Sequence, residues 1–123
     1  MANEFDVIIV GGGHAGCEAA VAAAKRLRPQ GKDVAMITLH PARIGVMSCN
    51  PAIGGLAKGQ LAKEVDALGG VMGEITDRAA IQYRQLNSSK GPAVRASRAQ
   101  CDKAIYALRM QERLKAEANL QVI

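Results

Sequence analysis

A chain of 123 residues, 49% of them hydrophobic and 22% charged, is long enough to bury one core and too apolar to be a disordered segment. Sixteen Lys and Arg residues against eleven Asp and Glu residues give a net charge of +5. This excess favours anionic partners such as cofactor phosphates, RNA or acidic protein surfaces, without choosing among them.

The cysteines and the short apolar runs indicate a soluble protein in a reducing compartment. Cys17, Cys49 and Cys101 are odd in number, widely spaced and without a CxxC pair, so we expect neither a disulfide framework nor a bound metal. A reducing cytoplasm suits such thiols. The apolar runs at 7–10 and 34–39 are too short to cross a bilayer, and no charged leader precedes a cleavable apolar stretch. We therefore expect a soluble protein with no membrane partner.

The first forty residues predict a strand, a helix and a second strand. Residues 6–10 are a short β-branched run that ends at glycines, which is typical of a strand covered on both faces in a parallel sheet. Residues 14–27 are crowded with alanine and predict a helix, which Pro29 and Gly31 end. Residues 34–39 predict the second strand, parallel to the first. The order predicts an α/β fold.

The middle of the chain predicts a long loop and then a helix. Residues 40–55 contain two prolines and three glycines, so we expect a loop, and so long a loop near a nucleotide pocket is usually functional. Residues 56–68 carry apolar residues at helical spacing, and two glycines end this predicted helix. Its apolar residues are Leu61, Val65 and Leu68.

The last third predicts a turn, a helix and the start of a strand. Residues 87–92 have turn chemistry, and Ser97-x-x-Gln100 resembles a capping box that opens a helix reaching about residue 118. Residues 120–123 look like the start of a further strand. Because a nucleotide-binding sheet normally has more strands, we expect residues 1–123 to be the N-terminal part of an FAD/NAD(P)-binding domain. Residues 40–119 are then a loop and helical insertion. The predicted helix presents one apolar face of Cys101, Ile105 and Leu108.

The motif Gly11-x-Gly13-x-x-Gly16, between a predicted strand and helix, is the dinucleotide-binding fingerprint. Gly11 permits a tight turn, Gly13 lets the backbone approach a pyrophosphate, and Gly16 lets the helix lie close to the strand. The helix N-terminus then presents N–H groups to the phosphates. The end of the second strand reads Thr-Leu-His at 38–40, without the carboxylate that usually binds the ribose there. The motif alone therefore does not show whether the nucleotide is FAD or NAD. A tight turn without a ligand is the alternative.

Several longer segments resemble one family. They are Gly11-Gly-Gly-His-Ala-Gly16, Met47-Ser-Cys-Asn-Pro-Ala-Ile-Gly-Gly55, Glu64-Val-Asp-Ala-Leu-Gly-Gly70, Leu86-Asn-Ser-Ser-Lys-Gly-Pro-Ala-Val94 and Arg98-Ala-Gln100. Together they span nearly the whole chain and resemble the glucose-inhibited division protein A family, flavoproteins that modify wobble uridines in tRNA. That family also lacks the usual carboxylate at the ribose end.

The resemblance implies a Rossmann-like FAD-binding domain that is incomplete in this chain. The implied enzyme uses FAD, NADH and methylenetetrahydrofolate to attach a carboxymethylaminomethyl or aminomethyl group to C5 of uridine 34 in tRNA. Its implied partners are tRNA, a second copy in a homodimer, and a tRNA-modification GTPase in a heterotetramer. The amine donor is glycine or ammonium. Family proteins are several times longer, so we expect this chain alone to be inactive.

The candidate site residues fall into three groups. Those expected to bind the cofactor are Gly11, Gly12, Gly13, His14, Ala15, Gly16, Asn50, Gly54, Gly55 and Lys58. Cys49 is the catalytic candidate, because a thiolate facing the flavin could add to uracil C6 or to a methylene carrier, whereas a packed thiol is the alternative. Lys90, Arg95 and Arg98 are candidates to contact tRNA phosphates or a folate carboxylate, with surface solvation as the alternative.

Two other functions stay open. The folate-dependent tRNA uridine methylating flavoprotein shares the glycine turn, although we do not associate the Cys49-Asn-Pro block with it. A non-catalytic basic fragment that binds RNA or protein would also account for the +5 charge.

Overall fold

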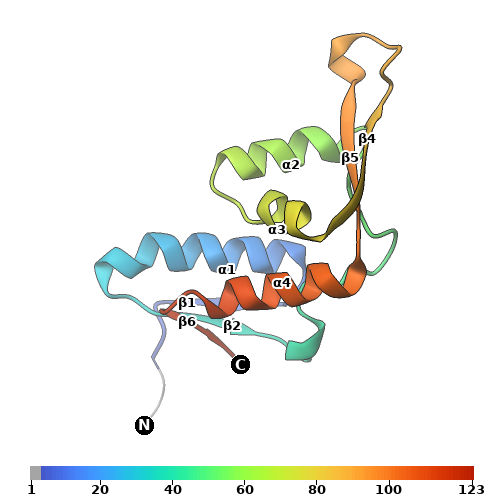
Figure 1. The fold of residues 1–123 in the computed structure, drawn as a ribbon. Coiled ribbons are helices and arrows are strands. Elements are labelled where there is room, and N and C mark those ends of the chain that lie inside the picture. The colour runs from blue at the N-terminus through green and yellow to red at the C-terminus, as the bar shows by residue number, and fades with distance from the viewer. Residues whose placement is uncertain (1–3) are drawn as a thin grey trace. The chain divides into compact units, whose positions relative to one another are not determined.

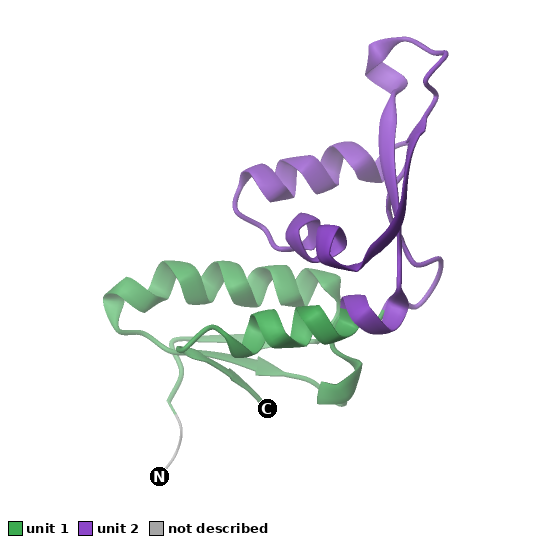
Figure 2. Cartoon of the chain, viewed as in Figure 1, with its two compact units in different colours: residues 1–46, 107–123 green, residues 47–106 purple. Residues whose placement is uncertain are grey.

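The computed structural model describes residues 4–123, which form two compact units (Figures 1 and 2). Unit 1 comprises the described residues up to Val46 together with Ala107–Ile123, and unit 2 comprises Met47–Tyr106. No helix within the described residues combines the length and the apolar character needed to cross a membrane.

Unit 1 is built on a parallel sheet of three strands, β1 (Val7–Val10), β2 (Val34–Ile37) and β6 (Leu120–Val122). The strand β2 lies in the middle, where Val34 is opposite Val7 on one side and Leu120 on the other. All three predicted strands are thus confirmed, and so is the α/β class with a parallel sheet.

The helix α1 (His14–Leu27) lies along one face of this sheet and follows the predicted bounds (Figure 1). Its small residues allow a close approach, because Cys17, Ala20, Val21 and Ala24 are all buried, as are residues 34–36 of β2. A short 3₁₀ helix, Arg28–Gln30, follows, and Gly31 ends it in the left-handed conformation.

The strand β1 is not covered on both faces, so that prediction is wrong for this chain. Ile9 faces Gly16 of α1, whereas Ile8 and Val10 point to the opposite side and are 55% and 82% exposed. The described residues leave much of that face open to solvent.

Unit 2 holds an antiparallel sheet in the order β3 (Ala52–Gly54), β5 (Ala96–Cys101), β4 (Ala80–Leu86). Two helices, α2 (Lys58–Ala67) and α3 (Met72–Ala79), contact the sheet and each other. The turn at 87–92 is confirmed, since Asn87 adopts φ 54° and the 3₁₀ helix Pro92–Val94 follows within the link from β4 to β5. The buried core of this unit includes Val71, Ile75, Ala79, Ala96, Ala99 and Cys101.

Two local predictions for the middle of the chain need correction. The segment 40–55 is not all loop, because it contains the 3₁₀ helix Pro41–Arg43 and the strand β3. The predicted helix at 56–68 is confirmed as α2, but its apolar residues do not form core: Leu61 and Leu68 are 61% and 89% exposed. The residue of α2 that is buried is Gly59.

The capping box is also wrong, because Ser97 and Gln100 lie inside β5, where the central strand pairs with both of its neighbours. The helix α4 (Lys103–Lys115) begins later, and Asp102 caps it: its Oδ1 accepts hydrogen bonds from the backbone N–H groups of Ala104 and Ile105, at 2.8 and 2.9 Å. Cys101 is a buried strand residue. The buried residues of α4 are Tyr106, Ala107, Met110 and Leu114, whereas Ile105 and Leu108 are exposed.

Candidate functional site

The glycine turn of unit 1 connects the end of β1 to the start of α1. Gly11 has φ 109°, a left-handed conformation that a side chain would strain, and its N–H donates to the Ile37 carbonyl at 2.8 Å. Gly16 lies against the Gly11 carbonyl oxygen so closely that a Cβ would collide with it. The first and third glycines of the motif therefore have local reasons to be glycine: one for the turn, the other for helix packing.

Gly12 is held by the segment that follows β2. Its carbonyl oxygen accepts a hydrogen bond from the Gly45 N–H at 3.0 Å. A Cβ at position 12 would come within 2.8 Å of Ile44 Cγ1 and 3.1 Å of Thr38 Oγ1. Gly12 thus has a packing role that the motif does not predict, because its neighbours come from residues far along the chain.

Gly13 differs from the other three glycines of the turn because nothing in the described chain explains why this position is a glycine. Its backbone has φ −75° and ψ −177°, a conformation open to any residue. A Cβ there would meet no atom within 4 Å, and both Gly13 and Ala15 are exposed. The N-cap residue of α1 is Gly13, which has no side chain to cap the helix. An accessible helix start beside an unobstructed glycine fits the pyrophosphate of a dinucleotide.

The end of β2, where a carboxylate usually binds the ribose, holds no acidic residue. Thr38 Oγ1 lies beside Gly12, its backbone N–H donates to the Ile123 carbonyl at 2.9 Å, and Leu39 is 93% exposed. The structure therefore offers a hydroxyl, not a carboxylate, beside the turn.

Cys17, one residue after the fingerprint, is an unreactive structural thiol. Burial is the main cause that raises its pKa to about 11, and the charge of Glu18 adds to the effect. The thiol lies 3.7 Å from the Gly12 carbonyl oxygen, within the contact distance of a weak S–H donor. Cys17 therefore stays protonated at neutral pH.

Cys49 and its neighbours belong to unit 2. Both Cys49 and Asn50 are exposed, in an irregular segment just before β3. Two backbone bonds order the segment, since the Asn50 carbonyl accepts from Ala52 N–H at 2.7 Å and the Pro51 carbonyl accepts from Cys101 N–H at 2.6 Å. Cys49 is thus an accessible thiol beside an ordered strand, in contrast to the two buried cysteines.

Gly54 and Gly55 form the link from β3 toward α2. Both have positive φ, 101° and 115°, and a Cβ on Gly54 would collide with the Ser97 carbonyl oxygen. The same carbonyl accepts a hydrogen bond from Gly55 N–H at 3.1 Å. Lys58 is exposed and is the first residue of α2. Backbone geometry alone therefore accounts for these two glycines.

The three cationic candidates lie on the hairpin formed by β4 and β5. Lys90 and Arg95 are at its tip, where Arg95 Nε donates to the Lys90 carbonyl at 3.1 Å. Arg98 is on β5, directly across from Arg84 of β4. Sequence reasoning missed Arg84, and the signal that could have found it is the alternation of apolar and polar residues over 81–84.

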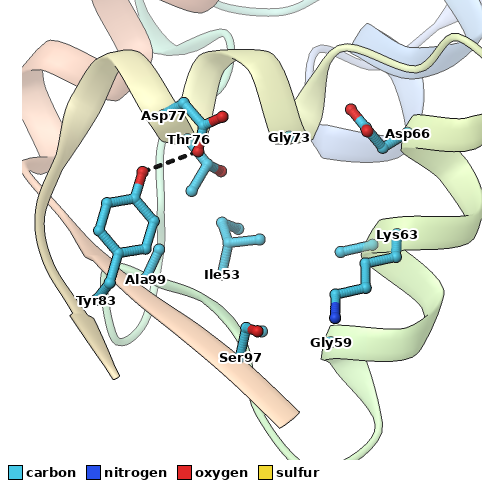
Figure 3. A pocket seen from close by; sticks show the side chains of 12 residues that line it. Ile53, Gly59, Lys63, Asp66, Gly73, Thr76, Asp77, Tyr83, Ser97 and Ala99 are labelled. Atoms are coloured by element: carbon cyan, nitrogen blue, oxygen red, sulfur yellow. Dashed lines mark hydrogen bonds between the residues drawn. The ribbon is translucent and has the colours of Figure 1, made fainter. Parts of the chain in front are cut away.

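A pocket of about 300 Å³ lies in unit 2 between the helices and the sheet (Figure 3). Lys63 and Asp66 come from α2 and Asp77 from α3, and Tyr83 Oη of β4 donates to Asp77 Oδ1 at 2.8 Å. This hydrogen bond raises the pKa of Tyr83. None of the residues singled out as catalytic or tRNA-contacting lines the pocket, and Gly54 is the one cofactor candidate that does.

Comparison with known proteins decides the family. The model of the family described as glucose inhibited division protein A matches residues 6–123. This chain belongs to that family. One similar protein is the tRNA uridine 5-carboxymethylaminomethyl modification enzyme MnmG of Salinibacter ruber, which is 57% identical over 119 residues. The match covers 97% of this chain and 17% of the relative, so the chain spans about a sixth of the length of that protein.

Solved structures agree with the family and the fold. The structure of Aquifex aeolicus GidA (form II crystal) matches with a TM-score of 0.90 and 50% identity, covering 98% of this chain and 19% of that one. The structure of pqsL from Pseudomonas aeruginosa, a probable FAD-dependent monooxygenase, matches with a TM-score of 0.59 and 18% identity over 98% of this chain and 33% of that one, which shows the fold alone. The family resemblance and the Rossmann-like fold that it implied are thus confirmed.

Proposed function

We propose that this chain is the N-terminal part of an FAD-dependent enzyme that modifies C5 of uridine 34 in tRNA. The product carries a carboxymethylaminomethyl or aminomethyl group, and NADH and methylenetetrahydrofolate are co-substrates. The full-length protein acts as a homodimer with a tRNA-modification GTPase. We also propose that residues 40–119 are an insertion between two strands of the nucleotide-binding sheet.

The observation that carries the proposal is the geometry at Gly13. Three neighbouring glycines are explained by contacts or by φ, whereas Gly13 has an ordinary backbone and open space where its side chain would be. A ligand whose phosphates approach the backbone there supplies the missing reason. The name of the Salinibacter ruber relative supports tRNA uridine as the substrate, and the description of pqsL, which has the same fold, as a probable FAD-dependent monooxygenase supports a flavin.

In this proposal the residues at 11–16 bind the pyrophosphate of FAD. Backbone N–H groups at the start of α1 face the phosphates, and the positive end of the helix dipole stabilises their charge. Thr38 is near enough to Gly12 to offer a hydroxyl to the adjacent part of the nucleotide. Asn50, Gly54, Gly55 and Lys58 are proposed to border the flavin ring. FAD, when bound, would supply hydride-transfer chemistry that amino-acid side chains lack.

Cys49 is proposed as the nucleophile. Its Sγ is exposed, so it can reach a substrate carbon, whereas burial keeps Cys17 and Cys101 away from solvent. Purified full-length protein with Cys49→Ser should retain FAD and bind tRNA but lose modification activity. In the native protein an alkylating reagent should modify Cys49 faster than either buried cysteine. Full activity of the Cys49→Ser protein would contradict the assignment.

Nucleoside analysis tests the reaction. Deleting the gene should remove the C5 modification from uridine 34, and the intact gene should restore it. Loss of the ribosylthymine methyl group instead would favour a folate-dependent uridine methylating flavoprotein. Unchanged nucleosides, together with purified full-length protein that carries no flavin, would overturn the proposal.

A further inference from the structure

The hairpin of unit 2, residues 80–101, has an unusual charge distribution. It carries four cationic residues and none of the eleven acidic residues of the chain, so it holds four of the five net positive charges. Figures 1 and 2 show it running beyond α2 and α3 within unit 2. The four cations are Arg84, Lys90, Arg95 and Arg98.

Two of these cations face each other directly. Arg84 of β4 and Arg98 of β5 are register partners in the antiparallel sheet, and so are Gln82 and Gln100 beside them. Residues opposite one another in this way have Cβ atoms roughly 5 Å apart, and like charges in that position repel. Within residues 4–123 neither guanidinium forms a salt bridge. The sheet therefore holds two uncompensated positive charges side by side.

One small concavity of about 160 Å³ on the hairpin is lined by these two register pairs, Arg84 with Arg98 and Gln82 with Gln100. A guanidinium presents a planar fork of N–H donors that matches phosphate oxygens, and glutamine amides add further donors. An anion between Arg84 and Arg98 would turn their repulsion into attraction to a shared partner. The donors that line the pocket therefore match the oxygens of a phosphate group.

The other two cations indicate that the phosphate belongs to a chain of phosphates. Lys90 and Arg95 are exposed at the hairpin tip, beyond the end of β4 at Leu86. At about 3.3 Å per residue, Arg84 lies roughly 7 Å before that end, so positive charge continues along the ribbon past the pocket. A single free phosphate needs only the pocket, whereas an extended polyanion uses the whole hairpin.

We infer that the β4–β5 hairpin binds the phosphodiester backbone of tRNA, with one phosphate between Arg84 and Arg98 and further phosphates at Lys90 and Arg95. The inference rests on the proposed function and adds to it the place where RNA contacts unit 2. Backbone contacts of this kind fix the position of the RNA without reading its sequence.

The test uses full-length protein with Arg84→Gln, Arg98→Gln and the double substitution. Arg78→Gln is the matched control, since Arg78 is an exposed arginine of unit 2 whose guanidinium is paired with Glu74 at 2.8 Å. Affinity for an unmodified tRNA transcript is measured by fluorescence anisotropy over a range of KCl concentrations. Flavin absorbance and melting temperature are recorded for each protein.

Arg84→Gln and Arg98→Gln should each weaken tRNA binding about tenfold and reduce the magnitude of the slope of log K against log [KCl] by about 1. The double substitution should reduce the magnitude of that slope by about 2. Arg78→Gln should leave the affinity and slope unchanged. Arg84→Lys, which keeps the charge but loses the fork, should retain the slope. Flavin content should stay the same, and melting temperature should not fall, because a repulsive pair is relieved.

If the wild-type protein binds tRNA and the double variant binds it with the same affinity and the same salt slope, the inference is overturned and the proposed function is left intact. Weakened binding of methylenetetrahydrofolate or loss of FAD, with normal tRNA binding, would also overturn it, by assigning the pocket to a small ligand. A wild-type protein that does not bind tRNA would contradict both the hairpin inference and the proposed function. The nucleoside analysis of the deletion strain would then test the proposed function separately.

Discussion

Gly16 of α1 lies against the carbonyl oxygen of Gly11, at the turn that ends β1, with no room for a Cβ between them. The contact joins two glycines of the fingerprint within the protein itself. It also separates the motif into parts that serve the fold and a part that serves a ligand, because Gly13, midway between them, touches nothing that a methyl group would disturb.

Gly16→Ala should destabilise the protein by about 1–3 kcal/mol, because the added methyl group forces α1 away from the turn and the surrounding core is closely packed. The melting temperature of full-length protein, with and without added FAD, measures the effect. A loss of stability in both conditions is expected. Unchanged melting in the absence of FAD would show that the turn tolerates a side chain at position 16.

The raised pKa of Cys17 predicts a loss of stability at alkaline pH. In the unfolded chain the thiol ionises near pH 9, whereas burial keeps it protonated in the folded protein up to about pH 11. Between these values the unfolded state binds fewer protons, so the free energy of unfolding falls as pH rises. Cys17→Ala should flatten this part of the stability curve, as measured by urea unfolding at pH 8 to 11. An identical decline in that variant would assign the effect to other groups.

Asp102 should be the cap of α4. Removing its side chain with Asp102→Ala leaves the N–H groups of Ala104 and Ile105 without their acceptor, so stability should fall by about 1 kcal/mol. Asp102→Asn keeps an acceptor oxygen and should retain most of that stability. Ser97→Ala tests the rejected capping box: it should change helix stability little, because Ser97 is exposed and lies in β5.

Residues 6–39 were predictable from the sequence because the signals there are local. A β-branched run, a glycine turn and an alanine-rich helix each depend on neighbours within a few residues. The class of fold and the glycine turn followed directly. The packing role of Gly12 did not, because Thr38 and Ile44 lie about thirty residues away in the chain.

Unit 2 was predicted less well because its sheet depends on partners distant in sequence. Ser97 and Gln100 have the spacing of a capping box, but β5 pairs with β3 and β4 on its two sides, and these cross-strand bonds outweigh a local preference. The apolar spacing of Leu61, Val65 and Leu68 predicted a helix correctly. It could not show whether that face is covered, because periodicity identifies a face and not its partner.

The central claim is that the glycine turn binds the pyrophosphate of FAD, and the affinity of full-length Gly13→Ala protein for FAD tests it most directly. Its backbone conformation and open surroundings predict an intact fold with an unchanged melting temperature in the absence of FAD. A methyl group in the path of the phosphates should weaken FAD binding about tenfold or more, equivalent to at least about 1.4 kcal/mol. Gly91→Ala, an equally unobstructed glycine outside the turn, is the control and should bind FAD normally. A Gly13→Ala protein that binds FAD as tightly as wild type would contradict the account.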